Sequence, residues 1–184
     1  STSANWVIAV DAQTGVELWR FDPGLQKDIR YSSSASRGVS LWHGSAAVCP
    51  SRIFLGTLIG ELIALDALTG EPCSDFGVNG RVDLSKGAGS VELGEYSITS
   101  PPAILGDLVI VGSAIGDNRA TDLERGIVRA IDAQTGSIQW LWDPIPKSTN
   151  DKARATWNGD SNLSTGAANA WAPLTADPSS GLIY

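Results

Sequence analysis

The sequence predicts an all-β fold built from repeated units. A short phrase occurs three times in the 184-residue chain, as "IAVDAQTGVELW" from position 8, "IALDALTGEPC" from position 63 and "RAIDAQTGSIQW" from position 129. Apolar residues alternate with period two beside each Thr-Gly pair, and no stretch shows the 3.6-residue period of a helix. Because a phrase repeated in this way marks a reused structural unit, we expect a repeat architecture rather than three catalytic motifs.

Each copy of the phrase predicts a tight β-hairpin. Its glycine accepts the positive φ that a tight turn between two strands requires. Its aspartate can accept hydrogen bonds from the turn's own amides, which assigns Asp11, Asp66 and Asp132 to turns. These three residues are therefore expected to be structural.

Two tryptophans occupy equivalent positions in the repeat. Trp19 and Trp140 each lie eight residues after the repeat aspartate, where the middle copy has Ser74, with Phe76 as a substitute nearby. Aromatic side chains at a repeated position usually pack between units. We expect Trp19 and Trp140 to do so.

Further strands complete a four-stranded unit. The runs "SPPAIL" and "DLVIVGSA" flank a turn and precede "GIVRAIDA" and "SIQWLWDP", and "WAPLTA" and "GLIY" flank "DPSSG" in the same way. The prolines fit the start of a first strand. Four-stranded units in series predict a β-propeller.

The repeats are spaced more widely than a bare propeller blade. The repeat aspartates are 55 and 66 residues apart, whereas a blade needs about 40–45 residues. We therefore expect inserted loops, which usually build the binding face of a repeat scaffold: "RYSSSASRGVSLWHGSAAVCP", Lys86 to Tyr96, and "IPKSTNDKARATWNGDSNLSTGAAN". Residues 1–184 are expected to form two blades and pieces of two others within a single domain, truncated at both ends.

Charge and hydropathy exclude some classes of function. The net charge of −7 argues against a nucleic-acid surface. No apolar run approaches the roughly 20 residues that a membrane helix needs. The chain also lacks a nucleotide-binding glycine-rich loop, paired-cysteine zinc spacing and a histidine suited to a catalytic triad.

The two cysteines leave two alternatives open. Cys49 lies just before the strand "RIFLGT" and Cys73 just after the strand "LIALDA", so a hairpin around "LIGE" would bring them near one another. They are either two buried thiols or a disulfide. A disulfide would imply an oxidising compartment.

Nearly the whole chain resembles a known family. The repeat "DAQTGxxxW", with "SRGVSLW", "TSPPAILGDLVIVGS", "GDN" and "NAWAPLTADPSSGLIY" in this order, is similar to the PQQ-dependent quinoprotein dehydrogenases, most closely the membrane-bound glucose dehydrogenase branch. The resemblance implies an eight-bladed propeller with tryptophan-docking motifs. It also implies PQQ on the propeller axis, a Ca²⁺ or Mg²⁺ ion, and a location on the periplasmic side of the bacterial inner membrane.

The resemblance implies a role for each of several residues. Arg37 resembles the arginine that meets a PQQ carboxylate, and a guanidinium forms bidentate bonds to such a group. Thr99 resembles a hydroxyl donor to another PQQ oxygen. Trp171 resembles the tryptophan beneath the PQQ ring, and Asn169 lies where the family places a polar PQQ contact.

The metal site is implied in the same way. Asp117 in "GDN" resembles the carboxylate that binds the divalent ion, since a hard cation prefers oxygen ligands. Asn118 resembles a neighbour of the metal or substrate. From the residues alone, Asp117 would be interpreted as a turn residue beside Asn118.

The chain departs from the family at three places. The loop "YSSSAS" lacks the adjacent cysteines of the alcohol dehydrogenases, and Ser33 and Ser36 stand where the glucose branch has His and Cys. His43 is not at the family's histidine position, and we expect it in a surface loop. The family's catalytic carboxylate falls beyond Tyr184, so no residue of this chain is assigned as the general base.

The function expected from the resemblance is oxidation of a sugar or polyol. D-glucose to gluconolactone is the first candidate, with electrons passed to ubiquinone; another polyol, quinate or an alcohol is the alternative. A non-catalytic propeller scaffold and a sugar-binding propeller are the other hypotheses, and neither explains the combination of Arg37, Thr99, Asp117 and Trp171.

Overall fold

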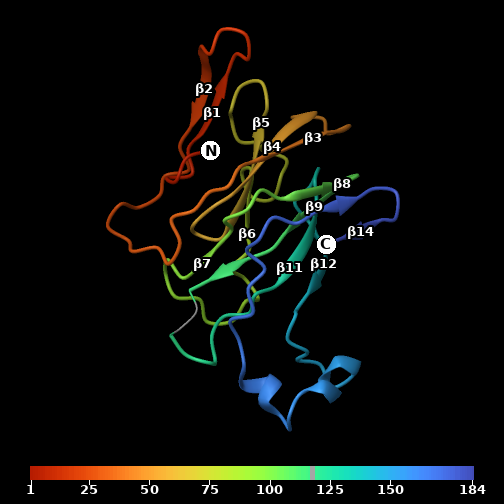
Figure 1. Ribbon diagram of the computed structural model, residues 1–184. Coiled ribbons are helices and arrows are strands. Elements are labelled where there is room, and N and C mark those ends of the chain that lie inside the picture. Colours follow the sequence, from red (N-terminus) through yellow and green to blue (C-terminus); the bar gives the residue numbers. More distant parts are fainter. Residues whose placement is uncertain (117–118) are drawn as a thin grey trace.

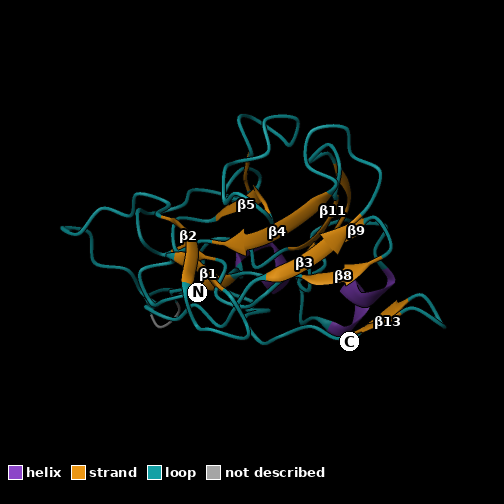
Figure 2. Cartoon of the chain, turned by 90° about the horizontal axis from the view of Figure 1, so that it is seen from above, coloured by secondary structure: helices purple, strands orange, loops and turns teal. Residues whose placement is uncertain are grey.

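The chain folds almost entirely into antiparallel strands. A computed structural model describes residues 1–116 and 119–184 (Figure 1). Within these residues the only helices are two short 3₁₀ segments, η1 (Lys152–Thr156) and η2 (Ser161–Ser164), drawn in purple in Figure 2. The all-β prediction is confirmed.

The first four-stranded sheet is formed by residues 40–83. Its strands follow one another in chain order, each antiparallel to the next: β3 (Ser40–His43), β4 (Ser51–Gly56), β5 (Glu61–Asp66) and β6 (Arg81–Asp83). The predicted hairpin around "LIGE" is β4–β5. At its turn Gly60 has a φ of 74°, and a side chain there would meet the ring of Tyr96.

The second four-stranded sheet is the unit that the sequence predicted in full. Its order is β12-β11-β9-β8, formed by β8 (Ala103–Leu105), β9 (Leu108–Val111), β11 (Val128–Asp132) and β12 (Ile138–Trp142). The first strand begins directly after Pro101 and Pro102, which have no amide N–H to give to a sheet.

Three two-stranded sheets accompany them in the described part of the chain. β1 (Val7–Val10) pairs with β2 (Glu17–Phe21), and β13 (Ala176–Asp177) pairs with β14 (Leu182–Ile183). The third joins β7 (Tyr96–Ser97) to β10 (Ala114–Ile115) and was not anticipated. Figure 1 places the β1–β2 hairpin at one end of the molecule and the 3₁₀ segments at the other.

The two four-stranded sheets share one core. Phe54 and Leu62 of the first sheet cluster with Val109, Val111 and Ile131 of the second, and each is almost wholly buried. Such a shared apolar layer provides most of the free energy that holds two sheets together. Neighbouring repeats therefore stabilise one another.

The repeat aspartates cap their turns as predicted. Oδ1 of Asp11, Asp66 and Asp132 accepts hydrogen bonds of 2.7–3.1 Å from the amides two and three residues later. At Asp11 a hydrogen bond from the Thr14 hydroxyl, followed by those amides, lowers the carboxyl pKa.

The repeat tryptophans differ from each other. The Trp19 indole Nε1 donates to the Ala67 carbonyl at 3.2 Å, and its ring lies so close to Gly70 that a side chain there would overlap it. Trp19 thus packs on the turn of the next repeat. Trp140 stays 40% exposed on β12, so its predicted packing is not found among the described residues.

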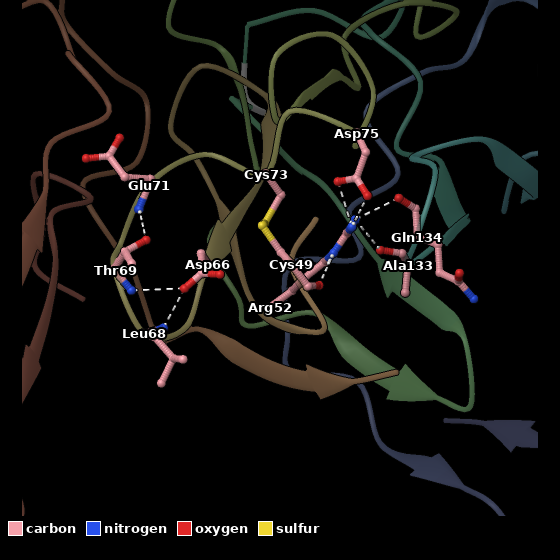
Figure 3. The surroundings of a disulfide bond; sticks show 10 residues. All are labelled: Cys49, Arg52, Asp66, Leu68, Thr69, Glu71, Cys73, Asp75, Ala133 and Gln134. Carbon is pink, nitrogen blue, oxygen red and sulfur yellow. Dashed lines mark hydrogen bonds and ion pairs between the residues drawn. A yellow bond between two sulfur atoms is a disulfide. The ribbon is translucent and has the colours of Figure 1, made fainter. Parts of the chain in front are cut away.

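Cys49 and Cys73 form a disulfide with a Cα–Cα distance of 5.9 Å, beside a buried arginine (Figure 3). Arg52 Nε donates to the Cys49 carbonyl at 3.0 Å, and its Nη2 pairs with Asp75 at 2.7 Å. Its Nη1 donates to the carbonyls of Ala133 and Gln134 in the second sheet's repeat turn, at 3.0 and 2.7 Å. Arg52 therefore ties the disulfide-closed segment to the neighbouring sheet.

Two expectations about loops were wrong. The segment predicted as the first inserted loop contains a complete strand, β3. This strand pairs with β4 and adds one strand to the edge of the first sheet. His43 consequently lies on a strand rather than in a loop, exposed, with Nδ1 2.8 Å from the Ser51 hydroxyl.

Candidate functional site

Four residues that the sequence singled out line one pocket. Arg37, Thr99, Asn169 and Trp171 surround a pocket of about 230 Å³ together with Ser33, Ala114 and Ile115. They come from the segment before β3, the segment after β7, and the segment between η2 and β13. The fold thus gathers positions up to 134 residues apart in sequence, from Arg37 to Trp171.

Arg37 and Trp171 face each other within this pocket. The Arg37 guanidinium carbon lies 5.0 Å from the centroid of the Trp171 ring, within cation–π range. The Arg37 amide donates to the Thr99 carbonyl at 2.9 Å, which fixes the segment before β3 against the one after β7. Trp171 is half-exposed, so part of its indole is open to a ligand.

Thr99 supplies the clearest sign of a binding role. The residue is only 3% exposed, and its hydroxyl oxygen has no hydrogen-bond partner in the described part of the chain. A buried unpaired hydroxyl is costly, so a polar ligand atom in the pocket would be favoured there. An arginine, an unpaired hydroxyl and an open indole suit a flat aromatic ligand that carries carboxylates and carbonyl oxygens.

Asn169 is partly committed to the backbone. Its Oδ1 accepts from the Ile115 amide at 2.5 Å, and its Nδ2 lies 3.4 Å from the carbonyls of Ile115 and Ala167. These bonds hold the segment before β13 against β10. A direct ligand contact by Asn169 stays a prediction.

Asp117 and Asn118, the predicted metal ligand and its neighbour, lie outside the described residues. Among the described ranges, no three His, Cys, Asp or Glu side chains gather closely enough to hold a metal ion. The assignment of Asp117 therefore stays a prediction.

No helix in the described residues has the length and apolar content needed to cross a membrane.

Arg119 lies among three carboxylates. Nη2 pairs with Glu124 at 2.6 Å, Nη1 lies 3.1 Å from Glu92, and Nε lies 3.4 Å from Glu95. Burial disfavours the Arg119 charge, but Glu124, followed by Glu95 and Glu92, outweighs this effect and raises the pKa of Arg119. Nε also donates to the Gly116 carbonyl at 2.7 Å.

A second, more polar pocket adjoins the first. It measures about 510 Å³ and shares Ser33, Ala114 and Ile115 with the first; the other lining residues are Arg30, Ser32, Glu95, Gly116 and Arg119. Sequence reasoning missed its charged members. The one available signal was that Arg30 and Glu95 fall within segments predicted to build the binding face.

The serines that depart from the family pattern have different surroundings. Ser33 lines both pockets. Ser36 is bonded instead to the hydroxyl of Ser1 at 2.8 Å and lines neither pocket. Of the two, Ser33 is the one placed to contact a ligand.

The fold and this pair of pockets define an all-β repeat domain with a candidate ligand site between its loops and strand ends. Over residues 1–184 the chain matches the PQQ family described as glucose/ethanol/alcohol dehydrogenase β-propeller domains, and it belongs to that family.

The relatives are catalytic proteins much longer than this chain. The glycerol dehydrogenase large subunit of Gluconobacter oxydans is 33% identical over 187 residues, and quinoprotein glucose dehydrogenase A of Acinetobacter calcoaceticus is 31% identical over 198. Both matches cover 100% of this chain but only 25% and 24% of those proteins.

A solved structure shows the same fold. The quinohemoprotein alcohol dehydrogenase of Comamonas testosteroni superposes with a TM-score of 0.72 at 27% identity, covering 97% of this chain and 26% of that one. The chain therefore spans about a quarter of the proteins it resembles.

Proposed function

We propose that this chain is part of a PQQ-dependent dehydrogenase that oxidises a sugar or polyol. The specific reaction proposed is D-glucose to gluconolactone, with electrons passed to ubiquinone. The observation that carries the proposal is the pocket in which Arg37, the unpaired Thr99 hydroxyl and the open Trp171 ring meet. Family membership supports the same conclusion.

The residues of the pocket fit PQQ. Arg37 would pair with a carboxylate of the cofactor, the Thr99 hydroxyl would bond one of its oxygens, and Trp171 would lie against its flat ring. Asn169 would orient this wall through its bonds to Ile115. When bound, PQQ would supply the two-electron acceptor that oxidation of an alcohol requires.

The remaining parts of the site are proposed from the resemblance. Asp117 would provide a carboxylate to Ca²⁺ or Mg²⁺, with Asn118 beside the metal or the substrate. The group that takes the proton of the substrate hydroxyl is expected beyond Tyr184, in the longer protein.

The proposed whole is an eight-bladed propeller. Residues 1–184 would form two of its blades and parts of two others, on the periplasmic side of the bacterial inner membrane. The contact of Trp19 with Gly70 and Ala67 supports tryptophan docking between neighbouring blades.

The test is a dye-linked oxidation assay on the longer protein that contains this chain. PQQ and Ca²⁺ or Mg²⁺ are added, and D-glucose is compared with glycerol, quinate and ethanol. We expect glucose turnover that requires both PQQ and metal. PQQ-dependent turnover of another alcohol would keep the proposed reaction class and replace glucose as the proposed substrate. Absence of both turnover and PQQ binding would reject the proposal.

A further inference from the structure

The pocket beside the proposed cofactor site has hydrogen-bonding groups that the protein itself leaves unused. This second pocket is called the polar pocket below, and it is lined by Arg30, Ser32, Ser33, Glu95, Gly116 and Arg119, besides the shared Ala114 and Ile115. The polar pocket opens beside the residues that would hold PQQ. The part of a substrate that extends beyond its reacting hydroxyl would therefore lie in this pocket.

One carboxylate in the polar pocket is held in place but incompletely bonded. The Glu95 side chain is 23% exposed, and only its Oε2 lies near a cation, 3.4 Å from Arg119 Nε. The Gly116 amide donates to the Glu95 carbonyl at 2.8 Å, and any side chain at Gly116 would overlap the Glu95 carboxylate. Within the described ranges, Glu95 Oε1 accepts no hydrogen bond, so it can accept one from a ligand.

Two donors line the same pocket. Arg30 is exposed, and its guanidinium makes no hydrogen bond or ion pair with any described residue. The Ser33 hydroxyl oxygen accepts from the Ala35 amide at 3.3 Å, which leaves its proton free to donate. Ser32, by contrast, is already used, because its hydroxyl donates to the Gly94 carbonyl at 3.1 Å.

The charge balance of the pocket disfavours an anionic ligand. Arg119 is already paired with Glu92, Glu95 and Glu124, so Arg30 is the one guanidinium there without a carboxylate partner. Glu95 lines the pocket itself, whereas Glu92 and Glu124 reach Arg119 from outside the lining. Among the described residues, three carboxylates thus surround the two guanidiniums of Arg30 and Arg119. A neutral ligand whose hydroxyls both donate and accept fits this arrangement better than a carboxylate.

We propose that Glu95 and Arg30 determine substrate specificity by binding the hydroxyls of a neutral polyol. Glu95 accepts a hydrogen bond from one hydroxyl, and Arg30 and Ser33 donate to others. A monohydric alcohol would leave these groups unpaired, and a site built to bond a hydroxyl rejects analogues that lack it. This inference rests on the proposed function and deepens it.

The experiment uses the longer protein loaded with PQQ and Ca²⁺, with D-glucose, glycerol, quinate and 1-butanol as substrates. We expect kcat/KM for a neutral polyol to exceed that for 1-butanol by about 100-fold or more. Glu95→Gln should raise KM for the polyol about 10-fold, because a hydrogen bond to a charged group is lost, with little change in kcat. Arg30→Gln should act in the same direction.

The matched control is Glu71→Gln. Glu71 is an exposed carboxylate in the repeat turn near the disulfide (Figure 3) and does not line the polar pocket. Its substitution should leave every KM unchanged. An absorbance titration with PQQ gives the cofactor Kd, which Glu95→Gln should also leave unchanged.

Two outcomes would overturn the inference. One is a higher kcat/KM for 1-butanol or quinate than for the neutral polyols. The other is a Glu95→Gln variant whose KM changes by the same factor for 1-butanol as for the polyol. If the protein binds PQQ and oxidises a substrate but shows one of these two outcomes, only the specificity role of Glu95 and Arg30 fails. If the unsubstituted protein neither binds PQQ nor oxidises any of the alcohols, the proposed function fails and this inference falls with it.

Discussion

Thr99 keeps a buried hydroxyl without a partner in the described structure, which is unfavourable unless a ligand uses it. We therefore expect Thr99→Val to leave the unfolding free energy of the PQQ-free protein unchanged, or to raise it by about 1 kcal/mol, since an unpaired polar group is removed. The same change should weaken PQQ binding about fivefold, the value of one hydrogen bond.

Denaturant unfolding and a PQQ titration test both parts of this prediction. Thr175→Val is the control, because Thr175 is exposed and lines neither pocket. A marked loss of stability in the PQQ-free protein would show that Thr99 serves the fold rather than the cofactor.

At the scale of single residues, sequence reasoning succeeded where the cause is local. The turn role of Asp132 was predictable because its partners are the amides two and three residues later. The place of Glu95 and Arg30 in the polar pocket was not, because it depends on β7 pairing with β10 and on the loop packed beside them. No nearby residue in the sequence signals that contact.

Among the elements, the repeat turn of the second sheet is attached to the first sheet through Arg52. The substitution Arg52→Met would leave the carbonyls of Ala133 and Gln134 without their hydrogen-bond donor. It would also leave the Asp75 carboxylate without its cation. We expect a loss of about 3 kcal/mol in unfolding free energy, as when one partner of a buried ion pair is removed.

Arg81→Met provides the matched comparison. Arg81 pairs with Glu61 at 2.6 Å, but both side chains are partly exposed, so its removal should cost about 1 kcal/mol or less. Chemical denaturation of the longer protein measures both variants. Equal effects of the two substitutions would contradict the role assigned to Arg52.

The elements themselves were largely predictable, with informative exceptions. Short apolar runs beside strong turn signals located β4, β5, β9, β11 and β12. Burial does not alternate along most of them, since β5, β9 and β11 are buried along nearly their whole length and β12 is exposed throughout. β3 was missed because it lies in a segment rich in serine, whose strand character comes from pairing with β4. Strand propensity depends on such neighbours more than on the residues alone.

For the molecule as a whole, β12 presents an uncovered apolar face. Ile138, Trp140 and Trp142 share one face of this strand and are each 40–58% exposed, and Leu182 and Tyr184 of the last hairpin are also exposed. Contiguous exposed apolar surface favours association. We therefore expect residues 1–184, expressed alone, to self-associate at micromolar concentration in sedimentation measurements.

Trp140→Gln together with Trp142→Gln should reduce this association, whereas Leu68→Gln, at an exposed turn position, should not. A monomeric chain of residues 1–184 that unfolds in one sharp cooperative thermal transition would refute the expectation.

The contact between Trp19 and the following repeat has a consequence for synthesis on the ribosome. The carbonyl that accepts the Trp19 indole hydrogen bond belongs to Ala67, which is 48 residues later in the chain. At translation rates of about 5–20 residues per second, Trp19 waits roughly 2–10 s before this partner is made. During that interval the nascent β1–β2 hairpin has an unburied indole, so each repeat is vulnerable to misassembly until the next one has emerged.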